Sequence, residues 1–279
     1  MKPWNLGKAI GQLTSTSDLA HNLAQCRILV QQAAQAGAQA LFLPEASDYI
    51  AASAAESISL AKPVEQSEFV LGLQDEARRW KLPIHVGVHE PAADGHKLKN
   101  TVLWIDERGE IVHRYQKIHL FDVDIEGGPV LRESESVERG MRIEPPFDTT
   151  VGKVGSTICF DLRFPEISIA LRRLGADIIT YPSAFTVPTG KAHWEVLLRA
   201  RAIETQSYVI AAAQVGNHNE KRVSYGHSMI VDPWGTVLAD LGDAGDGPKI
   251  GTAVIDHGLL QKVRTEVPLR RRTDVYPEV

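Results

Sequence analysis

Cysteine is scarce in this chain of 279 residues, which contains only Cys26 and Cys159. Two thiols can form at most one disulfide, and by themselves they cannot supply the four ligands of a structural zinc site. The sequence also lacks an uninterrupted apolar run of about 18 residues, and its first residues lack the apolar core of a secretory signal peptide. We therefore expect a cytoplasmic protein with reduced thiols and no membrane partner.

Neither sign of charge dominates the sequence. The chain has 30 basic and 35 acidic residues, a formal net charge of −5, and charges that are interspersed along its length. Because nucleic-acid-binding proteins usually gather Lys and Arg in one patch, nucleic acid is not an expected partner. Hydrophobic residues make up 43% and charged residues 23% of the chain. These values and the length are typical of one globular domain.

Short β-like runs alternate with amphipathic helices along the chain. Apolar residues at spacings of three and four predict one helix from Asp18 to Gly37 and another from Phe69 to Trp80. Further helices are expected to open at Phe164-Pro165-Glu166, to span about 191–206, and to lie near the C-terminal end. Expected strands cover 8–13, 40–43, 84–88, 102–105, 111–115, 154–160, 178–181 and 208–214, with hairpin turns at 106–110 and 232–235 and a last strand and helix within 251–264.

This order predicts an α/β domain over residues 1–267. The remaining segment, 268–279, contains three consecutive arginines and few apolar residues. We expect it to form a tail that lies on a surface or on a partner subunit.

Three chemically reactive side chains stand at or near the ends of apolar runs. Glu45 follows Leu41-Phe42-Leu43-Pro44, Lys117 lies in YQKIHLF, and Cys159 lies in ICFDLRFPE. A thiol becomes nucleophilic when a base or a positive charge favours its thiolate, and a carboxylate can take the thiol proton and return it to a leaving amine. A fixed cation can stabilise the oxyanion that forms on the attacked carbon.

Each of these residues also has a purely structural interpretation. Cys159 could be a small buried apolar residue, and Glu45 and Lys117 could belong to ordinary ion pairs. Cys26 lies on the apolar stripe of its helix, so we expect it to serve core packing.

Several segments resemble the nitrilase superfamily. LPEASDYI, RYQKIHLFDVDI and GSTICFDLRFPEI are similar to its three catalytic boxes, and the likeness extends through YPSAFT, HWEVLLRARAIE and YGHSMIVDPWG over nearly the whole chain. The resemblance implies a single-domain α-β-β-α sandwich that assembles as a homodimer or a higher homo-oligomer. Within the superfamily, HLFDVD, AFTVPTGKAHWE and AAQVGNH are similar to the Nit branch, and more to deaminated glutathione amidases than to ω-amidases.

The resemblance also implies a role for each reactive residue. Cys159 would be the nucleophile, and Glu45 the general base and acid. Lys117 and the backbone N–H of Phe160 would stabilise the oxyanion. Glu133 matches the second glutamate of the superfamily and would orient Lys117 or the surroundings of the thiol, although the preceding Gly127-Gly128-Pro129 departs from the commoner wording. An amide would then be hydrolysed through a thioester on Cys159, with no metal or organic cofactor.

The implied substrate carries carboxylates and a 2-oxo acid end. Hydrolysis of deaminated glutathione would yield 2-oxoglutarate and cysteinylglycine, a reaction of metabolite repair. Arg163 could bind a substrate carboxylate with two parallel hydrogen bonds, unless it pairs with Asp161 or Glu166 instead. Thr186 and Thr189 could supply hydroxyl groups to the substrate.

Two further groups of polar residues could in principle have a function. His85 and His89 share one face of a strand, but no neighbouring residue has ligand spacing, so no metal site is expected. Arg199, Arg201 and Glu204 are expected to form an ion-pair network on their helix or a dimer face.

Three alternative functions remain open. The protein could be an ω-amidase, which would act on 2-oxoglutaramate. It could also be an N-carbamoyl hydrolase, which would cleave a different kind of carbon–nitrogen bond. A nitrilase-fold scaffold would have no catalytic activity. The presence of all three required residue types counts against the scaffold.

Overall fold

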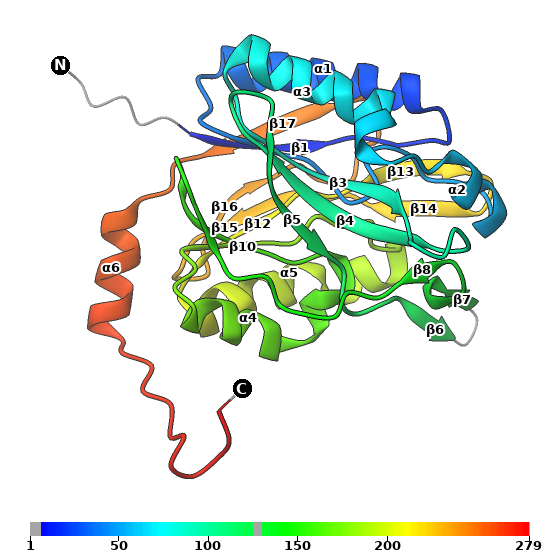
Figure 1. Cartoon of the computed structure of the whole chain (residues 1–279). Helices are drawn as coiled ribbons and strands as arrows, with labels where there is room; N and C mark the ends of the chain where they lie inside the picture. The colour runs from blue at the N-terminus through cyan, green and yellow to red at the C-terminus, as the bar shows by residue number, and fades with distance from the viewer. Residues whose placement is uncertain (1–6, 125–129, 279) are drawn as a thin grey trace.

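Two β-sheets lie face to face and carry helices on their outer sides, as the computed structural model shows for residues 7–124 and 130–278 (Figure 1). One sheet has the strand order β17-β1-β2-β3-β4-β5, with β8 paired to β4, and the other has the order β16-β15-β12-β11-β10-β9. This arrangement confirms the α-β-β-α sandwich that the sequence resemblance implied.

The strands of the first sheet are β1 (Lys8–Gln12), β2 (Leu41–Phe42), β3 (Ile84–Pro91), β4 (Leu98–Ile105), β5 (Ile111–Gln116), β8 (Val137–Glu138) and β17 (Lys249–Ala253). Those of the second are β9 (Phe147–Thr149), β10 (Gly152–Ser156), β11 (Ile178–Thr180), β12 (Tyr208–Ala211), β15 (Met229–Val231) and β16 (Val237–Asp240). Two short ribbons are formed by β6 (Asp122–Asp124) with β7 (Val130–Arg132) and by β13 (Val215–Asn219) with β14 (Arg222–Tyr225).

Helices cover the outer face of each sheet. The α-helices are α1 (Leu19–Gln35), α2 (Ala54–Leu60), α3 (Glu68–Trp80), α4 (Pro165–Arg173), α5 (Val187–Thr205) and α6 (His257–Glu266). Helices α1 and α3 pack on the first sheet, whereas α4 and α5 pack on the second (Figure 1). Asp18 caps α1 by accepting a hydrogen bond from the backbone N–H of His21, which satisfies one of the unpaired donors of the first turn.

Alternation along β4 separates the two cores that the first sheet touches. Leu103 and Ile105 face α1 and α3, whereas Val102 and Trp104 face the second sheet. Because successive side chains of a strand point to opposite faces, Asn100 lies on the same inner face as Val102 and Trp104. This placement brings a polar residue of β4 to the space between the sheets.

Three predicted boundaries were wrong. The strand predicted over 154–160 ends at Ser156, because Cys159 adopts a left-handed backbone conformation with φ of 47° and opens the 3₁₀ helix η3 (Cys159–Arg163). The strand predicted over 208–214 ends at Ala211, and the Ser228 hydroxyl accepts the N–H of Ala213. The helix predicted from about 191 begins at Val187, with a proline in its first turn.

Some elements were absent from the sequence prediction. Helix α2 has no buried residue, so hydrophobic periodicity could not reveal it. The ribbon strands are short, and β6 has no fully buried side chain. The remaining 3₁₀ helices are η1 (Val64–Gln66) and η2 (Glu133–Glu135).

Polar interactions join the chain after α6 to the body of the domain. Arg173 Nη1 lies 3.2 Å from Glu278 Oε1, and Arg271 Nη2 lies 3.4 Å from the Glu204 carbonyl oxygen. The Val275 side chain in this segment is 69% exposed. Among the described residues, no helix has the length and apolar character needed to cross a bilayer.

Candidate active site

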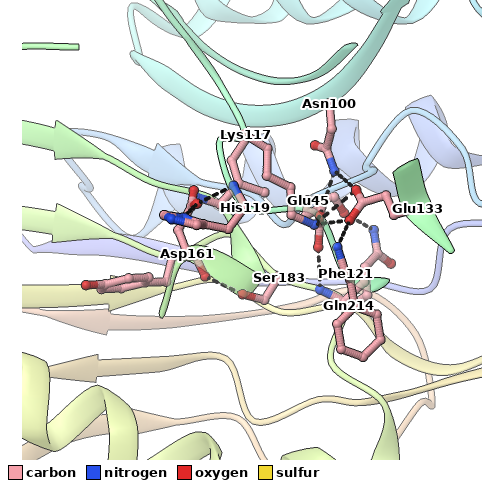
Figure 2. Close-up of polar contacts among 12 residues, drawn as sticks. Glu45, Asn100, Lys117, His119, Phe121, Glu133, Asp161, Ser183 and Gln214 are labelled. Carbon is pink, nitrogen blue, oxygen red and sulfur yellow. Dashed lines mark hydrogen bonds and ion pairs between the residues drawn. The ribbon is translucent and has the colours of Figure 1, made fainter. Parts of the chain in front are cut away.

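The three reactive residues identified in the sequence interact with one another, and Figure 2 shows Glu45 and Lys117 side by side. Glu45 follows β2, Lys117 comes directly after β5, and Cys159 follows β10. Lys117 Nζ lies 2.9 Å from Glu45 Oε1, and the Cys159 thiol interacts electrostatically with both groups. All three residues are buried, with Cys159 8% exposed.

Glycines allow the backbone to bring these residues close. A Cβ atom on Gly87 would lie 2.5 Å from the Glu45 Cα, and the Gly87 N–H donates to the Pro44 carbonyl. A Cβ atom on Gly140 would lie 2.3 Å from the Gln116 carbonyl oxygen, and the Gly140 N–H donates to the Lys117 carbonyl. A side chain at either glycine would therefore displace the segment that carries a reactive residue.

The nucleophile candidate itself has a strained backbone. Cys159 has a positive φ of 47°, a conformation that is unfavourable for residues other than glycine. Its N–H donates to the Pro182 carbonyl over 3.0 Å, which helps to hold the turn. The turn ends β10 and places the side chain of Cys159 at the carboxyl end of the sheet.

The Glu45 carboxylate is surrounded by donors. Oε1 accepts hydrogen bonds from Asn100 Nδ2 at 2.7 Å and from Lys117 Nζ at 2.9 Å. Oε2 accepts the backbone N–H of Ala184 at 2.9 Å. The side-chain amide of Gln214 donates to the Glu45 carbonyl oxygen, which fixes the backbone as well.

Glu133 lies on the other side of Lys117. Lys117 Nζ is 2.9 Å from Glu133 Oε2 and 3.1 Å from Oε1. Asn100 Nδ2 is 3.1 Å from Glu133 Oε1, and the Phe121 N–H donates to Oε2 at 2.6 Å (Figure 2). Glu133 thus contacts Lys117 as the sequence suggested. The divergent segment 127–129 that precedes it lies outside the described residues.

Charge neighbours decide the protonation states. Burial opposes ionisation of Glu45, but Lys117 and the hydrogen bonds from Cys159, Lys117 and Asn100 outweigh it and hold the pKa of Glu45 below its ordinary value. Burial would lower the pKa of Lys117, but the charges of Glu133, Glu45 and Cys159 raise it well above the ordinary value. Glu45 at rest is therefore a carboxylate, and Lys117 is an ammonium.

The Cys159 thiol, unlike Glu45 and Lys117, is in an environment that favours its uncharged form. Burial, followed by the negative charge of Glu45, raises the pKa of Cys159 against the smaller effect of Lys117. The resting group is therefore a neutral thiol beside a carboxylate. Such a pair can react only when the carboxylate takes the proton as the sulfur attacks.

Asp161 joins the two halves of the site. Its fully buried carboxylate accepts the Tyr115 hydroxyl at 2.7 Å and the Ile158 N–H at 2.9 Å on Oδ2. Its Oδ1 lies 3.0 Å from the His119 backbone nitrogen and 2.7 Å from His119 Nδ1. One carboxylate thus links the segment around Lys117 to the turn that carries Cys159.

Arg163 lies beside the site without a carboxylate partner among the described residues. The predicted alternative, an ion pair with Asp161 or Glu166, was wrong, because Arg163 Nη2 contacts His193 Nδ1 at 3.1 Å. The guanidinium also stacks over the rings of Phe160 and Phe185. Burial lowers the pKa of Arg163.

The other predicted site groups are the hydroxyls of Thr186 and Thr189 and the backbone N–H of Phe160. The Thr186 and Thr189 hydroxyl oxygens lie 2.8 Å from each other, so each already has a polar partner. Phe160 is the second residue of η3, and the Asp161 N–H makes the first bond of that turn, to Ile158. The Phe160 N–H therefore precedes the internal bonds of the helix and is positioned beside Cys159.

The polar groups outside the site have partners of their own. His85 Nε2 lies 3.1 Å from Thr180 Oγ1, and His89 Nδ1 lies 3.0 Å from Asp48 Oδ1. Within the part of the chain that the structure describes, no group of His, Cys, Asp or Glu residues is arranged to hold a metal ion.

The helix ion pairs expected on α5 are present. Arg201 Nη1 lies 2.8 Å from Glu204 Oε1, which confirms an ion pair there, and Arg199 Nη1 contacts Glu195 at 3.4 Å. The Arg201 guanidinium also donates to the Leu162 carbonyl oxygen, which ties α5 to η3.

Sequence reasoning missed several groups in and around the site, among them Gln214 and the Phe121 N–H. Asn100 could have been found, because it interrupts the inward apolar face of β4 with an amide. Asp161 was considered only as a partner for Arg163. The Ala184 N–H carries no sequence signal, because every residue except proline has one.

The similarity of the chain to known proteins agrees with this geometry. The carbon-nitrogen hydrolase family profile matches residues 9–265. Buried thiol, carboxylate and ammonium groups on an α-β-β-α sandwich define a nitrilase-type hydrolase. The chain belongs to the carbon-nitrogen hydrolase family, and it is a hydrolase that acts on carbon–nitrogen bonds other than peptide bonds.

Two curated relatives and one solved structure illustrate the similarity. The chain is 52% identical over 272 residues to the probable hydrolase nit2 of Schizosaccharomyces pombe, which covers 97% of this chain and 99% of that protein. It is 47% identical over 275 residues to the deaminated glutathione amidase of Mus musculus, covering 96% and 84%. Nit3 of Saccharomyces cerevisiae, described as a member of branch 10 of the nitrilase superfamily, superposes with a TM-score of 0.83 at 30% identity, covering 96% of each chain.

Proposed function

We propose that this hydrolase cleaves deaminated glutathione to 2-oxoglutarate and cysteinylglycine through a thioester on Cys159. The observation that carries the proposal is the buried cluster in which Lys117 Nζ lies 2.9 Å from the Glu45 carboxylate and the Cys159 thiol interacts electrostatically with both. The substrate is supported by the mouse relative, which is named deaminated glutathione amidase and covers 96% of the chain. The sequence likeness to the Nit branch points to the same substrate.

In the first half-reaction, Glu45 accepts the Cys159 proton while the sulfur attacks the amide carbonyl carbon. The carbonyl oxygen becomes an oxyanion, and Lys117 and the Phe160 N–H stabilise it. The tetrahedral intermediate then breaks its carbon–nitrogen bond. The amine leaves with the proton that Glu45 returns, and the acyl group remains on Cys159 as a thioester.

In the second half-reaction, water attacks the thioester carbon while Glu45 accepts a proton from that water. The new oxyanion occupies the same position beside Lys117. Its collapse breaks the carbon–sulfur bond and returns the proton to the sulfur. The products are a carboxylic acid and the resting thiol, so no metal or organic cofactor takes part.

Arg163 is the proposed partner for a substrate carboxylate. Its guanidinium is half-buried near Cys159 and meets no carboxylate among the described residues. The stacking of Phe160 and Phe185 keeps the guanidinium plane in place. Thr186 and Thr189 are proposed to supply hydroxyl groups at the same side of the site, after their mutual hydrogen bond opens.

Intact-mass spectrometry tests the proposed chemistry directly. The enzyme would be exposed briefly to deaminated glutathione and, separately, to 2-oxoglutaramate, and the acyl adduct would be located by peptide mapping. An adduct on Cys159, with faster release of amine from deaminated glutathione, is expected. Faster turnover of 2-oxoglutaramate would instead identify an ω-amidase, and release of amine from neither compound would support a scaffold.

We also propose the assembly and the location of the protein. Residues 1–267 would form the hydrolase domain, and 268–279 would lie against the partner subunit of a homodimer. The exposed Val196 and Ile203 on α5 and the exposed Val275 in the tail support this arrangement. Sedimentation of the full chain and of a chain that ends at residue 267 tests it. The proposed cytoplasmic location is tested by cell fractionation.

A further inference from the structure

The Glu45 carboxylate has almost all of its hydrogen-bonding positions occupied by fixed donors. A carboxylate offers about four lone-pair positions. Asn100 Nδ2 and Lys117 Nζ occupy both positions of Oε1, and the Ala184 N–H occupies one position of Oε2. These three donors leave one position on Oε2 open, which is the position available to the proton of Cys159.

We propose that Asn100 is a positioning residue that directs the proton of the reaction to a single place on Glu45. This inference rests on the proposed function of Glu45 as general base. With Asn100 in place, the S–H bond of Cys159 breaks and the new O–H bond forms on the Oε2 position that faces the sulfur. The same proton then passes to the nitrogen of the leaving amine. Without Asn100, a position on Oε1 becomes free, and the proton can settle where neither sulfur nor amine can reach it.

The placement of Asn100 supports this role. The residue lies on the inner face of β4, only 4% exposed, and its Nδ2 donates to both Glu45 Oε1 and Glu133 Oε1. Its carbonyl oxygen also accepts the N–H of Lys117 over 2.9 Å. One residue therefore contacts both carboxylates of the cluster and the backbone of its ammonium residue (Figure 2).

Its amide has one orientation that electrostatics permits. The Oδ1 atom of Asn100 is buried and has no hydrogen-bond partner. Turning the amide over would place this oxygen, instead of the Nδ2 donor, against the Glu45 and Glu133 carboxylates.

The side chains that face Glu45 together set the pH at which its carboxyl group ionises. Lys117 faces it from the end of β5, Cys159 from η3, and Asn100 from β4. Glu133 of η2 reaches it through Lys117 and Asn100. Removing the Asn100 donor leaves these charges unchanged, so its loss weakens only the stabilisation of the ionised Glu45. The pKa of Glu45 should therefore rise.

The test compares Asn100→Ala and Asn100→Ser with the wild-type enzyme over a range of pH. We expect kcat/KM for the amide to fall about 10- to 100-fold in Asn100→Ala, with KM little changed, because a hydrogen bond to a charged group has that effect. We expect the acid limb of the profile to move up by about one pH unit. Asn100→Ser should show a smaller shift, because one hydroxyl can donate to only one of the two carboxylates.

Alkylation of Cys159 by iodoacetamide gives the same information without a substrate. The acid limb of the alkylation rate against pH reports the ionisation of Glu45. In the Asn100 variants this limb should move by the same amount as the acid limb of kcat/KM. If wild-type enzyme hydrolyses none of the amides, the proposed substrate fails, while the alkylation profile still tests the role of Asn100. If Asn100→Ala does not fold, Asn100→Ser carries the test.

Asn22→Ala is the matched control. Asn22 is also a fully buried asparagine, but its amide donates to the Thr16 and Asp48 carbonyl oxygens, away from Glu45. We expect a lower melting temperature and an unmoved acid limb. The proposal is overturned if the limb stays in place in both Asn100 variants, or if Asn22→Ala moves it equally.

Discussion

The Tyr115 hydroxyl donates a hydrogen bond to the Asp161 carboxylate over 2.7 Å, in a part of the protein where both side chains are almost completely buried. Tyr115 belongs to β5, which leads directly into Lys117, and Asp161 belongs to η3, which begins at Cys159. The contact therefore fixes the distance between the two sheets at the point where their reactive residues meet.

This contact predicts a graded series of variants. Tyr115→Phe removes one of four donors and should lower the free energy of unfolding by about 1–2 kcal/mol. Asp161→Ala leaves the Ile158 and His119 donors unpaired and should cost about 3–5 kcal/mol. Urea unfolding monitored by fluorescence measures both. Equal effects of the two variants would contradict the view that Asp161 is the centre of the network.

Removal of the nucleophile and of the oxyanion donor should have different consequences. Cys159→Ala should abolish amine release and the acyl adduct, because the covalent route is lost. Lys117→Met should lower kcat about 10²- to 10³-fold, in line with the loss of one oxyanion donor. Steady-state kinetics measures both effects. Cys26→Ala, at the other and structurally buried cysteine, is the control and should retain full turnover.

The protonation states predict how thiol reactivity depends on Glu45. Because the pKa of Cys159 is raised by burial and by Glu45, the wild-type enzyme should show no ultraviolet thiolate absorbance at neutral pH. Glu45→Gln should strongly slow alkylation of Cys159, since the proton acceptor is gone. Fast alkylation of Glu45→Gln at neutral pH would show that the thiolate forms without Glu45.

Acid should remove a defined contribution to stability. The pKa of Glu45 is lower in the folded protein than in the unfolded chain, where it is about 4.3. Its ionisation therefore stabilises the fold fully above that unfolded value, and this contribution is lost as pH falls through the lower folded value. The difference in unfolding free energy between wild type and Glu45→Gln should shrink over that range. A difference that is independent of pH would contradict the lowered pKa.

Arg163 should act on substrate binding rather than on chemistry. Arg163→Ala should raise KM for deaminated glutathione about tenfold or more, the loss expected for a charge-assisted hydrogen bond, while kcat changes less. Arg163→Lys should recover part of the affinity, because it keeps the charge but loses the planar donor pair. Arg199→Ala on α5, where the guanidinium donates to the Gly235 carbonyl oxygen, is the control. An unchanged KM in Arg163→Ala would remove this residue from the binding site.

The sequence by itself determined the elements whose signals are local. The periodicity of α1 and α3 and the turn at 232–235 follow from side-chain spacing and turn chemistry, and the structure has them. The likeness of three short segments to the nitrilase superfamily also identified Glu45, Lys117 and Cys159 before any distance between them was known.

The tertiary structure alone decided which groups meet. Asn100 is 55 residues from Glu45 in the chain, and Ala184 is 139 residues from it, yet both donate to its carboxylate. It also decided the left-handed turn at Cys159 and the partner of Arg163, which is His193 and not a neighbouring carboxylate. Hydrogen bonds and pKa values depend on distances of a few ångströms across two sheets, and the packing of the whole domain sets those distances.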